Sequence, residues 1–457
     1  MRKRRMLMVL LAVSGLIGST WAIDNKGITF EQPAADCFTL IEGGKATPIL
    51  LDEKDDVGIV IAAKNLQDDF RKVTGRQAEL LHSVRGPRLI VAGSLESRFI
   101  KELVKAKKID ITSLKGKREK YLMKAVSRPF DGVDEAWVVI GSDKRGTIYG
   151  IYELSEQIGV SPWYDWADVP VVQCKDLYIR RGEYTAGEPA VKYRGIFLND
   201  EAPCLTGWVK HTYGTNYGDH RFYARVFELI LRLRGNFMWP AMWAWSFYAD
   251  DPENSKTAHD MGIIMGTSHH EPMARNHQEW ARKRKQYGVW DYATNQKVLD
   301  RFFREGIERV KDTEDLITIG MRGDGDAPMG GKEGADHEYV NRDEYNMNLL
   351  KKVIKNQRRI IKDVTGRPAD ERPQVWAIYK EVQRFYDMGL RVPDDVIMLL
   401  CDDNWGKCTS SAQCGRTQTS RRMGHVLSCG LCRCAEKFKM VECDSHTEHV
   451  GAVAVDV

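Results

Sequence analysis

The sequence has no long apolar run outside its first residues, which excludes a membrane-spanning helix in the rest of the chain. The run near its start, LMVLLAVSGLIG, is too short for a permanent span and follows the basic stretch MRKRRM. The small-residue stretch STWA then ends at Ala22. Basic, apolar and small-residue regions in this order are typical of a cleavable signal peptide over residues 1–22. We therefore expect a soluble protein that is secreted or periplasmic and has no membrane span.

A disulfide framework is also missing, although the chain contains 10 cysteines. Six of them lie in the last fifty residues, and the other four are scattered without framework spacing. From Cys429 onward the tail reads C-x2-C-x-C-x8-C-x2-H-x2-H, but these spacings fit no common zinc-ligand template. The sequence therefore predicts neither a disulfide scaffold nor a zinc site in this tail.

Excess charge is missing from the body of the chain. The formal net charge is +4, and the basic residues of MRKRRM alone contribute +4. Residues 407–457 contain seven Lys and Arg against five Asp and Glu, so residues 23–406 carry a net charge of −2. This balance gives no reason to expect a nucleic-acid partner. The glycine fingerprint of nucleotide-binding loops is absent as well, and we expect no cofactor.

Regular periodicity stops after LLCDDNWG, the stretch that ends at Gly406. The segment 407–457 has little apolar pattern of either the helical or the strand period. Codons for this segment can be chosen so that the neighbouring reading frame encodes the aromatic, proline and turn content of a folded domain. We therefore predict that one extra nucleotide after Gly406 shifts the frame. Residues 407–457 are then expected to be a non-native, disordered tail without function.

Residues 23–188 alternate predicted strands and helices. GIVIAAKNLQDDFRKVTG predicts a strand leading into an amphipathic helix, and RLIVAGS predicts a buried strand. EAWVVIGSDKRGTIYGIYELSEQIGV predicts a strand, a turn and a helix, with Asp143 expected to cap the start of that helix. This alternation favours an α/β accessory domain.

Residues 189–406 repeat the strand-and-helix unit six times. The predicted strands are nearly continuous in apolar residues, which is typical of a parallel sheet covered by helices. We therefore predict an α/β fold in which a partial (β/α)8 TIM-type catalytic barrel lacks its last two units. A doubly wound open sheet is the alternative, because six parallel strands also suit that fold. The strands are expected in YRGIFLND, FMWPAM, GIIMGTSHH, LITIGMRG, QVWAIYKE and VIMLLCDDN.

Polar and aromatic residues follow every predicted strand of 189–406. Barrel enzymes build their sites at the carboxyl ends of the strands, so we expect these groups to line one cleft. Carboxylates can do acid/base work at a sugar's anomeric centre, and an arginine offers a fork for an acidic substrate group. The groups are Asn199, Asp200, Glu201, Trp239, Ser268, His269, His270, Glu271, Arg322, Asp324, Asp326, Tyr379, Lys380, Glu381, Asp402, Asp403, Asn404 and Trp405.

Each of these groups also has a purely structural explanation. Trp239 fits packing inside a barrel, and Glu381 fits the first turn of a helix, where the dipole favours an acid. His269 and His270 fit satisfied core or loop histidines. With a nearby acid they also fit a metal site, but H-H-E lacks the i, i+4 spacing of a helical zinc motif, and no metal is predicted.

Six long motifs in order resemble glycoside hydrolase family 115, the xylan α-glucuronidases. The motifs are RGIFLNDEAPCLTGW, LRGNFMWPAMW, MGIIMGTSHHEPM, TIGMRGDGDAPM, IYKEVQRFYDMGLRVPDDV and CDDNWG. The resemblance covers residues 23–406 and implies an α/β accessory domain followed by a catalytic barrel. It also implies release of glucuronic or 4-O-methylglucuronic acid from glucuronoxylan with inversion and without a metal cofactor.

The same resemblance suggests roles for individual residues. Asp326 and Glu381 are expected to form the acid/base pair, in which one protonates the leaving oxygen and the other activates water. An inverting pair is typically about 6.5 to 9.5 Å apart. Arg322 is expected to face the substrate carboxylate, and its alternative partner is Asp324. The expected substrate-binding residues are Asp200, Glu201, Trp239, His269, Arg322 and Asn404.

Two other functions fit the same residues. A barrel glycosidase acting on another sugar, such as an N-acetylhexosaminide, would share the fold, and a non-catalytic carbohydrate-binding remnant would share the cleft. Because a barrel cut after six units exposes strand edges, we expect the chain as printed to fold poorly and to be inactive. The sequence leaves open the methylation state of the substrate, its chain length and the oligomeric state.

Overall fold

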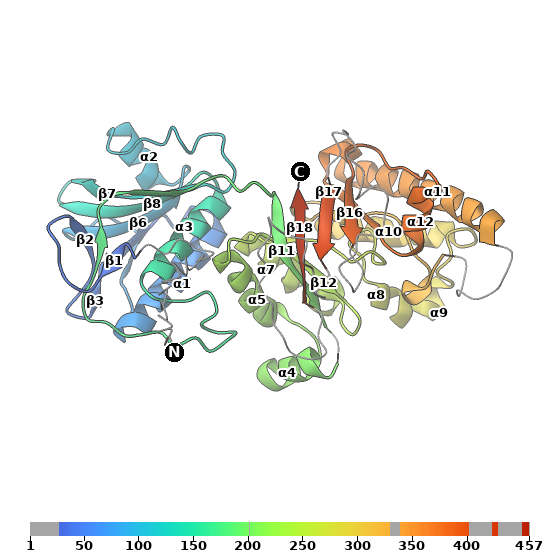
Figure 1. Cartoon of the computed structure of the whole chain (residues 1–457), viewed down its shortest axis with the longest axis horizontal. Helices are drawn as coiled ribbons and strands as arrows, with labels where there is room; N and C mark the ends of the chain where they lie inside the picture. The colour runs from blue at the N-terminus through green and yellow to red at the C-terminus, as the bar shows by residue number, and fades with distance from the viewer. Residues whose placement is uncertain (1–26, 201, 330–338, 402–422, 428–449, 457) are drawn as a thin grey trace, which may run out of the picture.

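The structure, a computed structural model, describes residues 27–200, 202–329, 339–401, 423–427 and 450–456. These residues form three sheets with helices packed on them, so the mixed α/β character expected from the sequence is confirmed. Figure 1 shows the N-terminal part beside a second part that is built around the strands β11, β18, β17 and β16. Among the helices described, none has both the length and the apolar content needed to cross a membrane.

The N-terminal part contains two sheets, with strand orders β1-β9-β2-β3 and β10-β7-β8-β6-β4-β5. Alternate residues of β6 point to opposite faces of the second sheet, as the strand period requires. Ile90 and Ala92 pack with α1 and α3, whereas Leu89 and Val91 pack with α2 on the other face. The elements are β1 (Thr29–Phe30), β2 (Cys37–Glu42), β3 (Lys45–Ala46), β4 (Ile49–Leu51), α1 (Val57–Thr74), β5 (Leu80–Leu81), β6 (Arg88–Ser94), α2 (Arg98–Lys105), β7 (Tyr121–Ser127), β8 (Glu135–Gly141), α3 (Lys144–Gln157), β9 (Leu177–Arg180) and β10 (Glu183–Ala186).

The strand predicted at the start of GIVIAAKNLQDDFRKVTG is absent, because this stretch, up to Thr74, lies in the helix α1. Its buried residues Ile59, Ala62, Ala63 and Leu66 recur at the helical spacing, so the prediction of a strand there is wrong.

Local capping explains where the two long N-terminal helices begin and end. The Asp56 carboxylate accepts a hydrogen bond from the Gly58 N–H at the start of α1, and Gly75 ends this helix at a φ of 73°. Asp143 accepts a hydrogen bond of 2.8 Å from the Gly146 N–H at the start of α3. The capping role predicted for Asp143 is therefore confirmed.

The third sheet has eight strands in the order β13-β12-β11-β18-β17-β16-β15-β14. Most neighbours are parallel, but β18 is antiparallel to both β11 and β17. The Leu316 N–H donates a 2.8 Å hydrogen bond to the Met265 carbonyl, which joins the two end strands of this order. The strands are β11 (Tyr193–Asn199), β12 (Phe237–Ala241), β13 (Ile264–Met265), β14 (Ile317–Thr318), β15 (Gln374–Ile378), β16 (Ile397–Cys401), β17 (Met423–Leu427) and β18 (Val450–Asp456).

Helices follow the strands along the chain, as the sequence analysis expected. The helix α5 lies between β11 and β12 in sequence, α10 between β13 and β14, and α11 between β14 and β15. One apolar cluster gathers residues from five strands of the third sheet, together with Leu316 directly before β14. Its members are Tyr193, Phe237, Trp239, Ile264, Leu316, Val375, Ala377, Ile397 and Leu399. The helical elements are α4 (Cys204–Tyr213), α5 (His220–Arg232), α6 (Phe247–Asp250), α7 (Glu253–Met261), α8 (His277–Arg282), α9 (Arg284–Tyr287), α10 (Gln296–Val310), η1 (Asp324–Asp326), α11 (Tyr339–Thr365), η2 (Ala369–Glu371) and α12 (Glu381–Asp387).

The structure differs from the sequence analysis in the segment 407–457, which was expected to be disordered. The strands β17 and β18 lie in this segment, and both belong to the third sheet. Their sequences, MGHVL and VGAVAVD, contain β-branched valines that favour extended backbone. The edges of β11 and β16 offer unpaired backbone groups that such extended segments can bond. The expectation of disorder is therefore wrong for these two stretches.

Candidate active site

The guanidinium of Arg322 joins two carboxylates that come from different strand ends. Its Nη2 donates to Glu381 Oε2 at 2.7 Å, and its Nε donates to Glu381 Oε1 at 3.1 Å. Its Nη1 donates to the Asp326 carboxylate and, at 2.6 Å, to the Asp326 carbonyl. Arg322 follows β14, Glu381 begins α12 after β15, and both are almost fully buried. The predicted acid/base pair Asp326 and Glu381 is therefore brought together on one cation.

Unusual backbone conformations turn the site residues toward one another. Asp326 has a φ of 65° and Lys380 a φ of 50°, both in the left-handed region that L-residues other than glycine rarely adopt. Gly325, between the two aspartates of η1, has a φ of 62°. Such conformations concentrate at functional sites, where the surrounding structure maintains them. The glycine-rich loop GMRGDGDAPM thus directs Arg322 and Asp326 toward each other.

His269 contacts the same aspartate. Its Nε2 lies 2.8 Å from Asp326 Oδ1, and its Nδ1 lies 3.1 Å from the Ser268 hydroxyl. Burial, together with the nearby charges of Arg322 and Lys380, lowers the pKa of His269 to about 3. A neutral imidazole with its proton on Nε2 donates to Asp326 and accepts from Ser268, which satisfies both ring nitrogens. His269 therefore holds the Asp326 carboxylate as a neutral donor.

Lys380 and Tyr379 complete the surroundings of Asp326. The Lys380 Nζ lies 3.3 Å from Asp326 Oδ2, and its side chain is 46% exposed. The Tyr379 ring meets the His269 ring edge to face, with centroids 4.7 Å apart. Both residues appeared among the strand-end groups of the sequence, but no role was predicted for either. Lys380 is the more accessible of the two cations on Asp326, since Arg322 is only 2% exposed.

Asp324 points away from this pair. Its carboxylate accepts a hydrogen bond of 2.8 Å from Arg284 Nη2 and lies 2.8 Å from His277 Nε2. The hydrogen bond from Arg284 holds the pKa of Asp324 below its usual value. The alternative pairing of Arg322 with Asp324 is therefore wrong, because Asp326 and Glu381 take the guanidinium instead.

Asp200, expected to bind substrate, uses its carboxylate on the chain itself. It accepts hydrogen bonds from the N–H groups of Trp243, Ala244 and Trp245, at 2.7, 3.0 and 2.7 Å. Burial raises the pKa of Asp200 to about 6, although these hydrogen bonds oppose the shift. Asp200 therefore fixes the loop that carries Trp243, whose indole is 42% exposed and stacks on the His270 ring.

Glu271 is a buried carboxyl group for which the sequence analysis predicted no role. It is completely buried, and its Oε1 accepts a 2.5 Å hydrogen bond from the Asn276 amide. Burial and the nearby charge of Asp200 raise the pKa of Glu271 well above its usual value. The sequence feature that could have pointed to Glu271 is its position in HHEP, directly after a predicted strand. A second pair of electrostatically coupled carboxyl groups, Asp200 and Glu271, thus lies beside the loop of Trp243.

Three other predicted site residues are not brought into this cluster by the described part of the chain. Trp239 is 3% exposed and packs against Phe197 in the apolar cluster of the third sheet, with ring centroids 5.2 Å apart. Packing is therefore the role that the structure shows for Trp239, and a place in the pocket wall stays a prediction. Glu201 and Asn404 lie outside the described residues.

Parallel strands bring two carboxylates, an arginine and a histidine into one buried cluster, and paired carboxylates at strand ends are the catalytic groups that α/β glycoside hydrolases use. The comparison with known families agrees. The family model of glycosyl hydrolase family 115 matches residues 186–448, and the chain belongs to this family.

Among solved structures, the chain is similar to BtGH115A, described as a GH115 4-O-methyl-α-glucuronidase with specificity for decorated arabinogalactans. The identity is 32% and the TM-score 0.71, over 85% of this chain and 49% of that one. The chain thus spans about half the length of this relative. The Flavobacterium johnsoniae chitobiase is 12% identical, with a TM-score of 0.46 over 82% of this chain and 54% of its own. A search of curated protein sequences finds no match.

Proposed function

We propose that the protein is an inverting α-glucuronidase that releases glucuronic or 4-O-methylglucuronic acid from glucuronoxylan or its oligosaccharides. The observation that supports this most is the Arg322 guanidinium bonded to both Asp326 and Glu381, with His269 on the same aspartate. Two carboxyl groups on either side of a glycosidic bond are what inverting hydrolysis needs. Membership in glycosyl hydrolase family 115 supports the same reaction class.

In this proposal each of the two carboxyl groups carries out one of the two proton transfers of the reaction. One of Asp326 and Glu381 gives its proton to the leaving glycosidic oxygen as the bond to the anomeric carbon breaks. The other takes a proton from the water that attacks that carbon from the opposite face. Arg322 holds both groups at fixed positions, and the neutral His269 orients the Asp326 carboxylate.

The carboxylate of the sugar needs a cationic side chain to bind it, and Arg322 and Lys380 both lie beside Asp326. The Arg322 guanidinium donates to Asp326 and Glu381 in the structure. Lys380 is 46% exposed and has one carboxylate contact at 3.3 Å, so it can turn to an incoming uronate more easily than Arg322 can. We therefore assign the recognition of the substrate carboxylate to Lys380 together with Arg322.

Substitution of the pair tests the proposal. We expect Asp326→Asn and Glu381→Gln each to lower the release of uronic acid from glucuronoxylan by about 10²- to 10⁴-fold, the usual contribution of general acid–base catalysis. Asp370→Asn is the matched control, because Asp370 is an exposed aspartate of η2 outside the site. Chromatography of the released acid measures the rate, preferably in protein whose reading frame after Gly406 has been restored. Unchanged turnover by either variant would remove that residue from the pair.

The second candidate is the same chemistry on another polysaccharide. The similarity to BtGH115A favours a uronic acid carried by decorated arabinogalactan as this alternative substrate. Parallel assays on glucuronoxylan and on decorated arabinogalactan distinguish the two, since only the true substrate should release uronic acid at a rate sensitive to Glu381→Gln. Release from neither substrate, together with binding to one of them, would favour a non-catalytic carbohydrate-binding function.

A further inference from the structure

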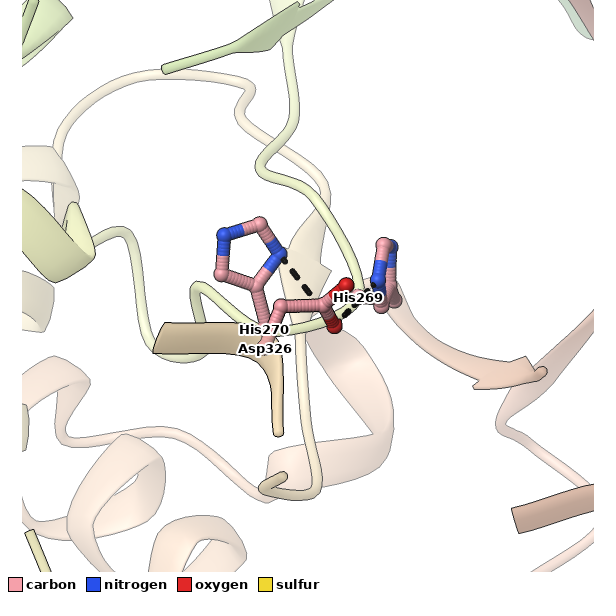
Figure 2. Close-up of side chains that lie close together, drawn as sticks. All are labelled: His269, His270 and Asp326. Carbon is pink, nitrogen blue, oxygen red and sulfur yellow. Dashed lines mark hydrogen bonds and ion pairs between the residues drawn. The ribbon is translucent and has the colours of Figure 1, made fainter. Parts of the chain in front are cut away.

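Three side chains capable of binding a metal meet beside the acid/base pair. One donor atom from each of His269, His270 and Asp326 lies within 4.8 Å of the others. Figure 2 shows the two imidazole rings on either side of the Asp326 carboxylate. We propose that these three residues bind a divalent transition-metal cation such as Zn²⁺ and that this cation inhibits the enzyme reversibly. The binding goes beyond the proposed function, whereas the inhibition rests on it.

His270 provides the independent evidence for a ligand between these groups. Its side chain is 4% exposed, and its Nδ1 is buried without a hydrogen-bond partner among the described residues. This nitrogen lies 4.0 Å from Asp326 Oδ1, which is too long for a hydrogen bond. Stacking on Trp243, with ring centroids 5.2 Å apart and an interplanar angle of 28°, holds the ring in this orientation. A buried polar atom left in this way is costly, and a cation between the nitrogen and the carboxylate would satisfy it.

The distances from Asp326 to the two histidine nitrogens are close to those of a metal site. Zinc lies about 2.0 to 2.1 Å from imidazole nitrogen and about 2.0 to 2.2 Å from carboxylate oxygen, so tetrahedral ligand atoms are about 3.4 Å apart. The separation from Asp326 Oδ1 is 2.8 Å for His269 Nε2 and 4.0 Å for His270 Nδ1. These values lie on either side of the ideal, and side-chain shifts of about half an ångström would bring both to it.

The surrounding charges make the binding reversible rather than permanent. Lys380 and Arg322 both contact Asp326, and a dication must compete with them. Lys380 can turn into solvent, because its side chain is 46% exposed, while Arg322 keeps its hydrogen bonds to Glu381. Two imidazoles and one carboxylate favour Zn²⁺, Ni²⁺ or Cu²⁺ over Mg²⁺ and Ca²⁺, which prefer oxygen ligands.

Occupation of this site would stop the proposed reaction for a simple reason. A carboxylate oxygen bound to a metal is not available to give or take a proton. Binding of the cation at His269 Nε2 also requires the proton on this nitrogen to move to Nδ1, where the Ser268 hydroxyl can accept a hydrogen bond from it, so the hydrogen bond from His269 to Asp326 is lost. Zn²⁺ should therefore act as an inhibitor that excludes the acid/base function of Asp326.

Direct binding tests the site without any assay of activity. Calorimetric titration of Zn²⁺ into the full chain should show a class of sites whose affinity falls at least about tenfold in His269→Asn and in His270→Asn. His211→Asn is the matched control, because His211 is an exposed histidine on α4 and should leave the affinity unchanged. Asp326→Asn serves as a further ligand variant should a histidine variant not fold, as judged by thermal unfolding.

The cysteines of the tail could also take up zinc, so a second probe separates the two sources. Co²⁺ bound to thiolates shows an intense sulfur-to-metal charge-transfer band, whereas Co²⁺ bound to nitrogen and oxygen does not. We expect bound Co²⁺ to give an absorption spectrum without the sulfur charge-transfer band, and we expect this spectrum to disappear in His270→Asn. Equal affinity for Zn²⁺ in the chain and in both histidine variants, or a cobalt spectrum from thiolates alone, would overturn the metal site.

Inhibition is tested separately in the active, frame-restored protein. Zn²⁺ should lower uronic acid release, EDTA should restore it, and Mg²⁺ at the same concentration should leave it unchanged. Zinc binding at His269 and His270 in a protein that releases no uronic acid would refute the proposed function and retain the metal site. Full activity with the site saturated by Zn²⁺ would overturn the inhibition.

Discussion

Burial shifts the pKa of two side chains near the site, and the two shifts change the stability of the folded chain in opposite directions as the pH falls. His269 has a pKa of about 3 in the folded chain against 6.5 for the free side chain, so the unfolded state binds the extra proton between these values. Folded stability therefore falls as the pH drops through that window. Asp200 has a pKa of about 6 against 3.8, so the folded state binds the extra proton. Its contribution to stability rises as the pH drops from about 6 to about 4.

These opposite signs lead to a paired prediction. When the pH falls from 7 to 5, His269 should lower the free energy of unfolding of the unsubstituted chain by about 2 kcal/mol, and His269→Gln should abolish this decrease. Over the same fall in pH, Asp200 should raise the free energy of unfolding of the unsubstituted chain by about 1 kcal/mol, and Asp200→Asn should abolish this increase. Urea unfolding of the three proteins at both pH values measures the differences. If both variants changed the pH dependence in the same direction, the burial argument would be wrong for one of them.

Individual site residues show how much of the site could be predicted from the polar residues that follow each strand. It placed Asp326, Glu381, Arg322 and His269 in one site, and the structure joins all four through hydrogen bonds. It could not separate Asp324 from Asp326, since the two differ only in where their backbone torsions send the side chains. The sequence also does not show that Glu271 is completely buried beside Asp200, because burial depends on loops from different strands.

Among the helices, α1 and α5 are joined by a buried ion pair that crosses from the N-terminal part to the second part of the chain. Arg232 Nη2 lies 2.8 Å from Asp69 Oδ2, and the two side chains are 3% and 0% exposed. Arg232 Nε also donates to Glu228 at 2.8 Å on its own helix. The Arg232 guanidinium lies over the Tyr152 ring, 4.6 Å from its centroid. These contacts tie the helix α5 to the helices α1 and α3.

Neighbouring aspartates of α1 provide a matched test of this pair. Asp69→Asn should lower the free energy of unfolding by about 3 kcal/mol, because it removes one of the two carboxylates that compensate the buried charge of Arg232 and leaves only Glu228. Asp68→Asn should cost at most about 1 kcal/mol, since Asp68 is 39% exposed and its ion pairs are screened by solvent. Chemical denaturation of both variants gives the two values. Equal losses would show that α1 and α5 are held together by apolar packing instead.

The strands β17 and β18 show that local sequence is a weak guide to strand formation. Neither MGHVL nor VGAVAVD stood out, because each is short and bounded by stretches with no clear period. Pairing with β16 and β11 supplies backbone hydrogen bonds that the segments cannot make alone. The antiparallel direction of β18 departs from an all-parallel ring, which no strand-by-strand reading of the sequence can reveal.

For the chain as a whole, the reading frame after Gly406 remains the main prediction to test. The family match continues to residue 448, past the point where we expect the frame to change. Deleting one nucleotide after the Gly406 codon should restore aromatic and apolar residues that cover the sheet, and so raise both the thermal unfolding midpoint and the rate of uronic acid release. Resequencing the DNA at this codon checks the premise directly. Equal stability and activity of the two forms would contradict the frameshift.

The sequence alone determined most of the order of strands and helices up to β16, because apolar periodicity and caps such as Asp143 act over a few residues. It failed at the start of α1, where a strand was predicted, and at β17 and β18. Family membership also followed from the order of the motifs. Only the tertiary structure decided that one buried arginine bridges Asp326 and Glu381, that Asp324 turns away to Arg284, and that Asp200 binds backbone instead of solvent. Those choices depend on positive φ angles and on contacts between residues distant in sequence, whose energies no local pattern contains.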